Sequence, residues 1–168
     1  RKQRQIADDN RFNTAANNNI SNMLINYNDL DAMNGIIKDT STLVQIYGEQ
    51  KGWDDETIMR AKIAAVTDGL KVAIGDAMSK EDYNSADTLL RTYKDIIDPN
   101  VYTTLTNSLA KIRLENVYYQ TAYNIVDKCI GADGYVDEAK LSQMIDQDFG
   151  PENDILEGIV PYSIPIST

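Results

Sequence analysis

The chain has 168 residues, a formal net charge of −10, no histidine and one cysteine, Cys129. This length suits one domain with a sizeable hydrophobic core, and a lone thiol excludes an intrachain disulfide. The lack of histidine excludes a Ser-His-Asp triad and a His-ligated metal, and the acidic balance opposes broad contact with nucleic acid phosphates.

The chain opens with a polar segment that predicts a helix over residues 3–27. The first residue is Arg1 rather than Met, so we expect the chain to be a segment of a longer protein. No apolar stretch follows the first cations, which excludes a secretory signal there. These cations could touch nucleic acid or a membrane, but the acidic body opposes both, and we interpret them as a mobile, solvated tail. They are Arg1, Lys2, Arg4 and Arg11.

Four apolar stripes at helical spacing follow between residues 30 and 128. Steps of three and four residues place each stripe on one helix face, and strict alternation is absent, so we predict helices and no strands. No run of about 18 apolar residues predicts a transmembrane helix. The stripes are Leu30, Met33, Ile37, Thr40, Val44, Tyr47; Met59, Ile63, Val66, Leu70, Ala73, Ala77; Ala86, Leu89, Leu90, Tyr93, Ile97; and Val101, Leu105, Leu109, Ile112, Tyr119, Tyr123, Val126.

The breaks between stripes carry helix-start chemistry. The pair Asn28-Asp29 and the residue Asp54 are predicted N-caps, since their side chains can accept the first free backbone N–H groups. The segment 81–84 is predicted to be a short polar connection before Ala86. Asp98-Pro99 marks another start, because proline fits the first helical turn. Connections this short favour antiparallel neighbours.

The charge changes after residue 128, where we place a domain boundary between 1–128 and 129–168. The second part contains eight acids and one base, Lys140. Residues 137–149 predict a short amphipathic helix. From Glu152 the prolines predict an extended linker.

Residues 131–138 are similar to part of an EF-hand calcium loop, with Gly134 as the obligatory glycine. That alignment puts Cys129 and Gly131 at acid positions and Lys140 where a bidentate Glu is required. We therefore interpret the segment as a helix-capping turn.

Other chemistry has little support in the sequence. No phosphate-binding glycine motif and no nucleophile elbow occur, and no acid stands alone in an apolar stripe, where its pKa would rise. Cys129 has no histidine to activate it, so we expect a structural, buried thiol. We predict no catalytic, cofactor-binding or metal-binding residue and no small-molecule substrate.

Aromatic residues give the predicted interaction surface, which consists of Trp53, Tyr118, Tyr119 and Tyr123. Tyrosine has an apolar ring and a polar tip, which suits contact surfaces as well as helix packing. Both interpretations stay open for the tyrosines, and Trp53 can equally cap the core at a helix corner.

Two stretches carry a family resemblance. Residues 46–57 end a predicted helix with Gly-Trp-Asp-x-Glu-Thr, and residues 82–90 contain Asp-Tyr-x-x-Ala, followed by Asp98-Pro99. Together with the Asn-rich residues 25–29, this order resembles the helical region of large bacteriophage internal or tail-associated virion proteins, over about residues 3–115. Such polypeptides often carry a lytic transglycosylase domain elsewhere, whose catalytic Glu-Ser context is missing here.

We therefore predict an all-α protein of five or six antiparallel helices, TPR-like or bundle-like, with an extended C-terminal segment. The resemblance implies a non-enzymatic structural module of a virion, made in the host cytoplasm and assembled with other virion proteins as an oligomer. One alternative is a fragment of a peptidoglycan-cleaving lytic transglycosylase. The other is a TPR-like adaptor that binds a peptide in a groove.

Overall fold

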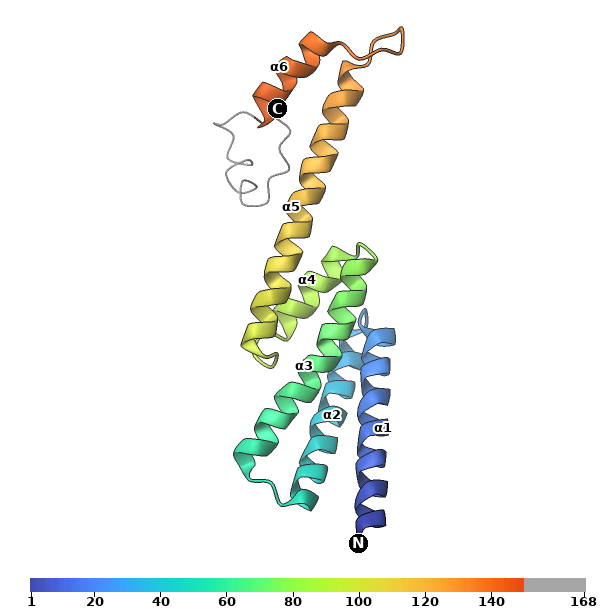
Figure 1. The fold of residues 1–168 in the computed structure, drawn as a ribbon, viewed down its shortest axis with the longest axis vertical. Coiled ribbons are helices and arrows are strands. Elements are labelled where there is room, and N and C mark those ends of the chain that lie inside the picture. The colour runs from blue at the N-terminus through green and yellow to red at the C-terminus, as the bar shows by residue number, and fades with distance from the viewer. Residues whose placement is uncertain (150–168) are drawn as a thin grey trace. The chain divides into compact units, whose positions relative to one another are not determined.

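The computed structural model describes residues 1–149, and this part of the chain folds into six α-helices (Figure 1). The predicted all-α class is confirmed, and no strand occurs within residues 1–149, where Ile130 and Val136 form a single antiparallel bridge. The extended segment predicted from Glu152 lies outside the described residues. The helices are α1 (Lys2–Asn26), α2 (Leu30–Lys51), α3 (Asp55–Ser79), α4 (Tyr83–Thr92), α5 (Pro99–Cys129) and α6 (Glu138–Phe149).

The chain divides into two compact units, Arg1–Leu109 and the part from Ala110 onward. The division falls inside α5, which belongs to both units as one continuous helix. We predicted a boundary after residue 128 from the change in charge, whereas the division after Leu109 follows from the packing of the chain. Within the described residues, no helix combines the length and apolarity needed to cross a membrane.

The helix starts lie where the capping aspartates predict them. The Asp29 carboxylate accepts a hydrogen bond from the Ala32 N–H at 3.0 Å, and Asp54 accepts one from Thr57 at 2.7 Å. Asp98 accepts bonds from two backbone N–H groups at the start of α5. The start of α4 was predicted too late. Asp82 caps α4 at Tyr83, so part of the predicted polar connection 81–84 is helical.

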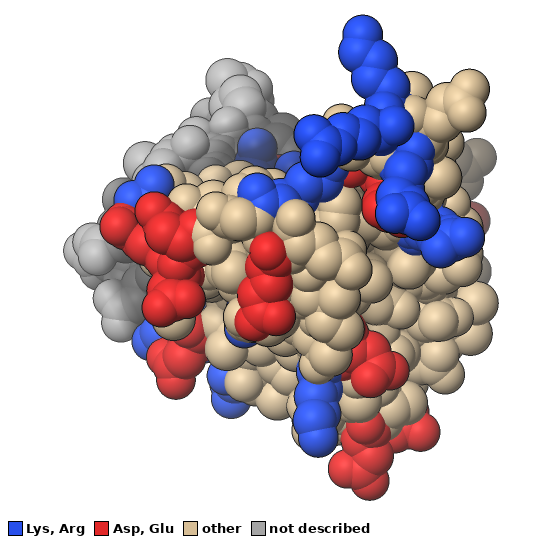
Figure 2. Space-filling view, turned by 90° about the horizontal axis from the view of Figure 1, so that it is seen from below, with Lys and Arg blue, Asp and Glu red and all other residues tan. Residues whose placement is uncertain are grey.

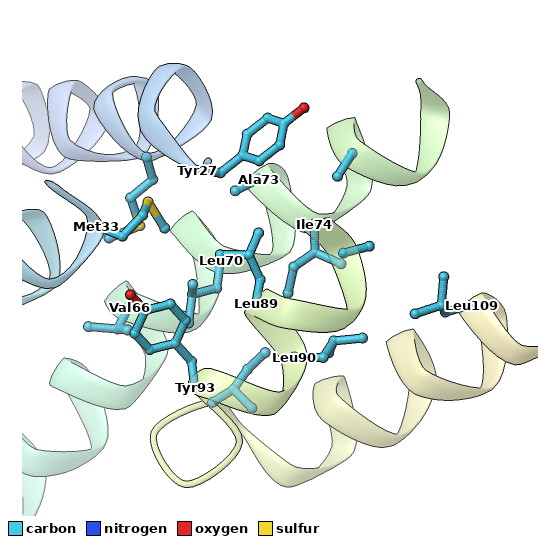
Figure 3. Packing of buried hydrophobic residues seen from close by; sticks show 14 residues of the cluster. Tyr27, Met33, Val66, Leu70, Ala73, Ile74, Leu89, Leu90, Tyr93 and Leu109 are labelled. Atoms are coloured by element: carbon cyan, nitrogen blue, oxygen red, sulfur yellow. The ribbon is translucent and has the colours of Figure 1, made fainter. Parts of the chain in front are cut away.

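In the first unit, α1, α2 and α3 pack against each other in pairs, and α4 packs on α3 (Figure 1). The core between them combines side chains from these four helices with the first turns of α5 (Figure 3). Met23 of α1 packs directly on Gly69 of α3, because a Cβ on Gly69 would lie 2.3 Å from the Met23 sulfur. The buried cluster comprises Met23, Tyr27, Met33, Val66, Leu70, Ala73, Ile74, Ala77, Ala86, Leu89, Leu90, Tyr93, Ile97 and Leu109.

The prediction that the second apolar stripe lies on the core face of its helix was wrong for the first two residues of the stripe. Met59 is 63% exposed and Ile63 is also exposed, whereas the neighbouring Ile58 is buried. Ile58 packs beside Gly48 of α2, where the missing Cβ leaves room for it. The core face of α3 therefore includes Ile58, and the stripe reaches the core only from Val66 onward.

Candidate interaction sites

Trp53 belongs to an aromatic cluster that joins α1, α2 and the turn between α2 and α3. The Phe12 and Tyr47 rings stack with centroids 4.0 Å apart, and Trp53 meets the Tyr47 ring edge-on at 5.5 Å. Gly52 adopts a left-handed φ of 72°, which ends α2 and turns the chain toward Trp53. The indole is thus held by packing, yet it remains about one third exposed (36%).

A charged pair stands beside these rings. The Asp9 carboxylate accepts a hydrogen bond from the Tyr47 hydroxyl at 2.7 Å and lies 2.6 Å from the Lys51 ammonium. The bond to Lys51, and then that to Tyr47, lowers the pKa of Asp9, while the bond to Asp9 raises the pKa values of Lys51 and Tyr47. The spacing of Tyr47 and Lys51 on one helix was visible in the sequence. Their partner Asp9, which lies 38 residues before Tyr47, was not.

A groove of about 320 Å³ lies next to the cluster, between α1 and α3. Thr40 and Val44 of α2 contribute buried lining residues, and the Thr40 hydroxyl accepts a bond from the Asn19 amide at 3.1 Å. Alanines and asparagine side chains make up much of the remaining lining. The groove is therefore a hollow with small apolar walls and neutral hydrogen-bonding amides. The lining is Phe12, Asn13, Ala16, Asn17, Asn19, Ile20, Met23, Thr40, Val44, Trp53, Ala61, Ala64, Ala65 and Asp68.

A second hollow, of about 300 Å³, has a more apolar lining and lies where α2 and α3 meet the connection between α4 and α5. Met59 and Ile63, the exposed beginning of the second stripe, belong to it together with Ile37 and Ile96. Sequence reasoning missed this hollow because it assigned the α3 side chains to the core.

The three predicted tyrosines all belong to the second unit, but they do not share one environment. Tyr118 is only 5% exposed, whereas Tyr119 is 55% and Tyr123 is 71% exposed. The Tyr118 and Tyr119 rings meet edge-on at 5.9 Å, and burial, with a smaller effect of Tyr119, raises the pKa of Tyr118. Tyr118 is therefore a packing residue, and the accessible part of the predicted surface on α5 is Tyr119 and Tyr123.

Backbone hydrogen bonds hold the turn between α5 and α6 closed. Gly134 takes a left-handed φ of 80°, and the Gly131 N–H donates to the Tyr135 carbonyl at 2.9 Å. The Lys140 ammonium, at the position where a calcium loop needs Glu, donates to the Lys128 carbonyl at 2.9 Å. Within residues 1–149, no three His, Cys, Asp or Glu side chains gather as a metal site would require.

Cys129 is buried, as expected, and its thiol lies 3.7 Å from the Met144 sulfur of α6. At the other end of the chain, the cations predicted to form a solvated tail are exposed, but Lys2, Arg4 and Arg11 belong to the helix α1 rather than to a mobile tail. In the view of Figure 2, many Lys and Arg side chains lie toward one side, and the acidic side chains form separate groups on a surface that is mostly uncharged.

Comparisons of the chain with family models, with curated proteins and with solved structures found no match.

Proposed function

We propose that the chain is a non-enzymatic structural and interaction module of a bacteriophage virion protein, located in the tail or the internal core. There it would contribute to assembly, to genome delivery or to holding a cell-wall hydrolase in place, and its partners would be other virion proteins. The resemblance suggests the virion, and the surface of the molecule suggests the interaction role.

The observation that carries the interaction role is the exposure of large apolar side chains from the helical stripes. Met59 and Ile63 are exposed on the first unit, and Tyr119 and Tyr123 are exposed on the second. Contiguous apolar groups on the surface of a folded chain commonly mark contact sites, because removing them from water is favourable. An interaction module accounts for these exposed stripe residues, because a partner would remove them from water.

The motifs behind the resemblance have clear structural roles. The Gly-Trp-Asp-x-Glu-Thr stretch forms the end of α2, the Trp53 turn and the capped start of α3. The Asp-Tyr-x-x-Ala stretch forms the capped start of α4, and Asp98-Pro99 starts α5. In all three places the residues that carry the resemblance shape the beginning or end of a helix, which supports the proposal of a structural region.

The decisive experiment combines the genetic neighbourhood with the contents of purified particles. We expect the reading frame around this segment to lie among capsid and tail genes. We also expect gradient-purified particles to contain its peptides at a fixed ratio to the capsid protein. A coding position among cellular genes, with no peptides in particles, would refute the virion assignment.

The enzymatic alternative makes an opposite prediction. A peptidoglycan hydrolase of the carboxylate type needs an acid with a raised pKa, whereas the pKa values of Asp9 and Asp54 are lowered. We expect the purified chain to leave the turbidity of a cell-wall suspension unchanged. Clearing that disappears when one glutamate is replaced by glutamine would establish the hydrolase instead.

The groove between α1 and α3 favours a second candidate, a TPR-like adaptor that binds an extended peptide. Asn13 and Asn17 lie one helical turn apart on its rim, and their amides can donate to and accept from a peptide backbone. Trp53, the only tryptophan of the chain, also lines the groove, so its fluorescence reports occupancy. Peptides selected from a random library should shift this fluorescence, and the N13L/N17L variant should abolish the shift. A library that yields no binder would remove this candidate.

A further inference from the structure

The groove between α1 and α3 has two chemically different ends. Phe12 and Trp53, which line it, belong to the aromatic cluster near the start of α3. Asp68 lines the groove further along, next to the place where Met23 packs on Gly69. The two helices run in the same direction (Figure 1), and Phe12 lies eleven residues before Met23. A helix rises 1.5 Å per residue, so the aromatic end and the acidic end are about 16 Å apart.

The walls between these ends are neutral. Ala61, Ala64 and Ala65 line the α3 side, and Asn13 and Asn17 line the α1 side. An amide side chain both donates and accepts hydrogen bonds, so it can pair with the backbone of any extended peptide. These walls therefore do not discriminate between peptides by charge, and such discrimination comes from the two ends of the groove.

At the acidic end, Asp68 is the one charged side chain among the described lining residues of the groove. It is exposed, and within residues 1–149 its carboxylate takes part in no hydrogen bond or ion pair. Lys71, one turn further along α3, is exposed but does not line the groove. A guanidinium group can donate two parallel hydrogen bonds to one carboxylate. This end of the groove therefore suits an arginine side chain.

The aromatic end suits an apolar ring. The Trp53 indole is held edge-on against Tyr47 and keeps an exposed surface on which a second ring can pack. Charges of both signs flank this end, because Arg11 precedes Phe12 and Asp54 follows Trp53. The Asp54 carboxylate already accepts the Thr57 N–H as the cap of α3. A cation on the ligand thus gains more from Asp68 than from the aromatic end.

We propose that the groove between α1 and α3 binds an extended peptide that carries an aromatic residue and an arginine four positions apart. The proposal rests on the peptide-binding candidate function and adds which peptides the groove selects. An extended chain advances about 3.3 Å per residue, so four steps cover about 13 Å, and the long arginine side chain spans the rest. Residues four apart in an extended chain also point to the same side, so both side chains can face the groove.

Blocked pentapeptides test the proposal on the full chain. The probes are acetyl-Phe-Ser-Ser-Ser-Arg-amide and its reverse, acetyl-Arg-Ser-Ser-Ser-Phe-amide, each paired with a version in which glutamine replaces arginine. Titration is followed by the fluorescence of Trp53, the single tryptophan. In one of the two directions we expect the arginine peptide to bind up to about fivefold more tightly than its glutamine version, as exposed ion pairs allow. Added salt should reduce this preference.

The D68N variant separates the proposal from peptide binding in general. It should bind the arginine and glutamine peptides equally, with the affinity for the glutamine version unchanged. The D39N variant is the matched control and should keep the preference, because Asp39 is exposed on α2 and lies outside the groove. Circular dichroism should show equal helix content in all three proteins.

Two results would overturn the proposal and leave the peptide-binding candidate intact. One is equal affinity of the wild-type chain for the arginine and glutamine peptides in both directions. The other is a preference for arginine that persists in D68N. The random peptide library tests the candidate function separately, so a library without binders removes both, whereas library binders without the arginine preference remove only this proposal.

Discussion

The packing around Gly48 makes a sharp prediction about two identical substitutions in one helix. Gly48 and Gly35 both lie in α2, and replacing glycine with alanine in a helix ordinarily stabilises it by about 1 kcal/mol. A Cβ on Gly35 meets nothing within 4 Å. A Cβ on Gly48 would lie 2.6 Å from Cγ1 of Ile58 and 2.9 Å from the Trp53 ring. Both variants gain the same helix propensity. The difference between their free energies of unfolding therefore measures the packing conflict at Gly48.

The size of that conflict follows from what Ile58 can do. Its Cγ1 is near the backbone, and a β-branched side chain in a helix has one strongly preferred rotamer, so it cannot easily move aside. Overpacking of a core by one methyl group typically costs about 1–3 kcal/mol. We therefore expect the G48A protein to unfold with a free energy about 1–3 kcal/mol lower than that of G35A, and G35A to exceed the wild type slightly.

Urea unfolding followed by Trp53 fluorescence is the appropriate assay, because this single tryptophan reports on the first unit alone. The midpoint should fall for G48A and rise for G35A, with similar slopes. The G75A variant in α3, where a Cβ also meets open space, serves as a second control. If G48A proved as stable as G35A, the close packing of α2 against Ile58 and Trp53 would be refuted.

Three further predictions concern hydrogen bonds that hold the first unit together. The D54A substitution removes the N-cap of α3 and should reduce the free energy of unfolding by about 1 kcal/mol in urea titrations, whereas D54N should retain most of it. The buried Thr67 hydroxyl accepts the Asp98 N–H at 2.9 Å, so T67V should lower the free energy of unfolding by about 1–3 kcal/mol while T67S preserves it. A T67V protein as stable as the wild type would show that this N–H finds another partner. For Asp9 the folded-state pKa lies below the unfolded value of about 3.9, so its stabilising effect is present above that pH and disappears as the pH falls through the folded pKa. The midpoint difference between wild type and D9N should therefore narrow as the pH falls below about 4, and a difference that is constant with pH would contradict the Lys51 and Tyr47 contacts.

The sequence predicted the helices well because their signals are local. A capping aspartate and the first free N–H groups of a helix lie within three residues, so Asp29 and Asp54 identify helix starts without any tertiary information. Pro99 marks the start of α5 in the same local way. Apolar spacing likewise identifies a helix face from neighbouring turns. These two signals were sufficient for the all-α class and for the positions of the connections.

The sites were harder to predict, because their geometry depends on residues far apart in the chain. The Asp9 carboxylate meets Tyr47 and Lys51 only after α1 and α2 have packed together. In the same way, Ile58 displaces Met59 from the core because Gly48 leaves space across the helix interface. Periodicity cannot rank two adjacent apolar residues of one helix when the partner helix decides which of them is buried.

The fourth stripe shows why such mismatches carry functional information. A helix of 31 residues is about 46 Å long, and the first unit covers only its beginning. If α5 served merely to end that unit, polar residues would suit the positions after Leu109 on the same face, since water would surround them. Instead Tyr119, Tyr123 and Val126 maintain the apolar spacing along α5 where the core of the first unit no longer requires it. Local spacing and tertiary packing agree up to Leu109 and diverge afterward, so the exposed part of this stripe is the part of α5 that a contact surface would explain.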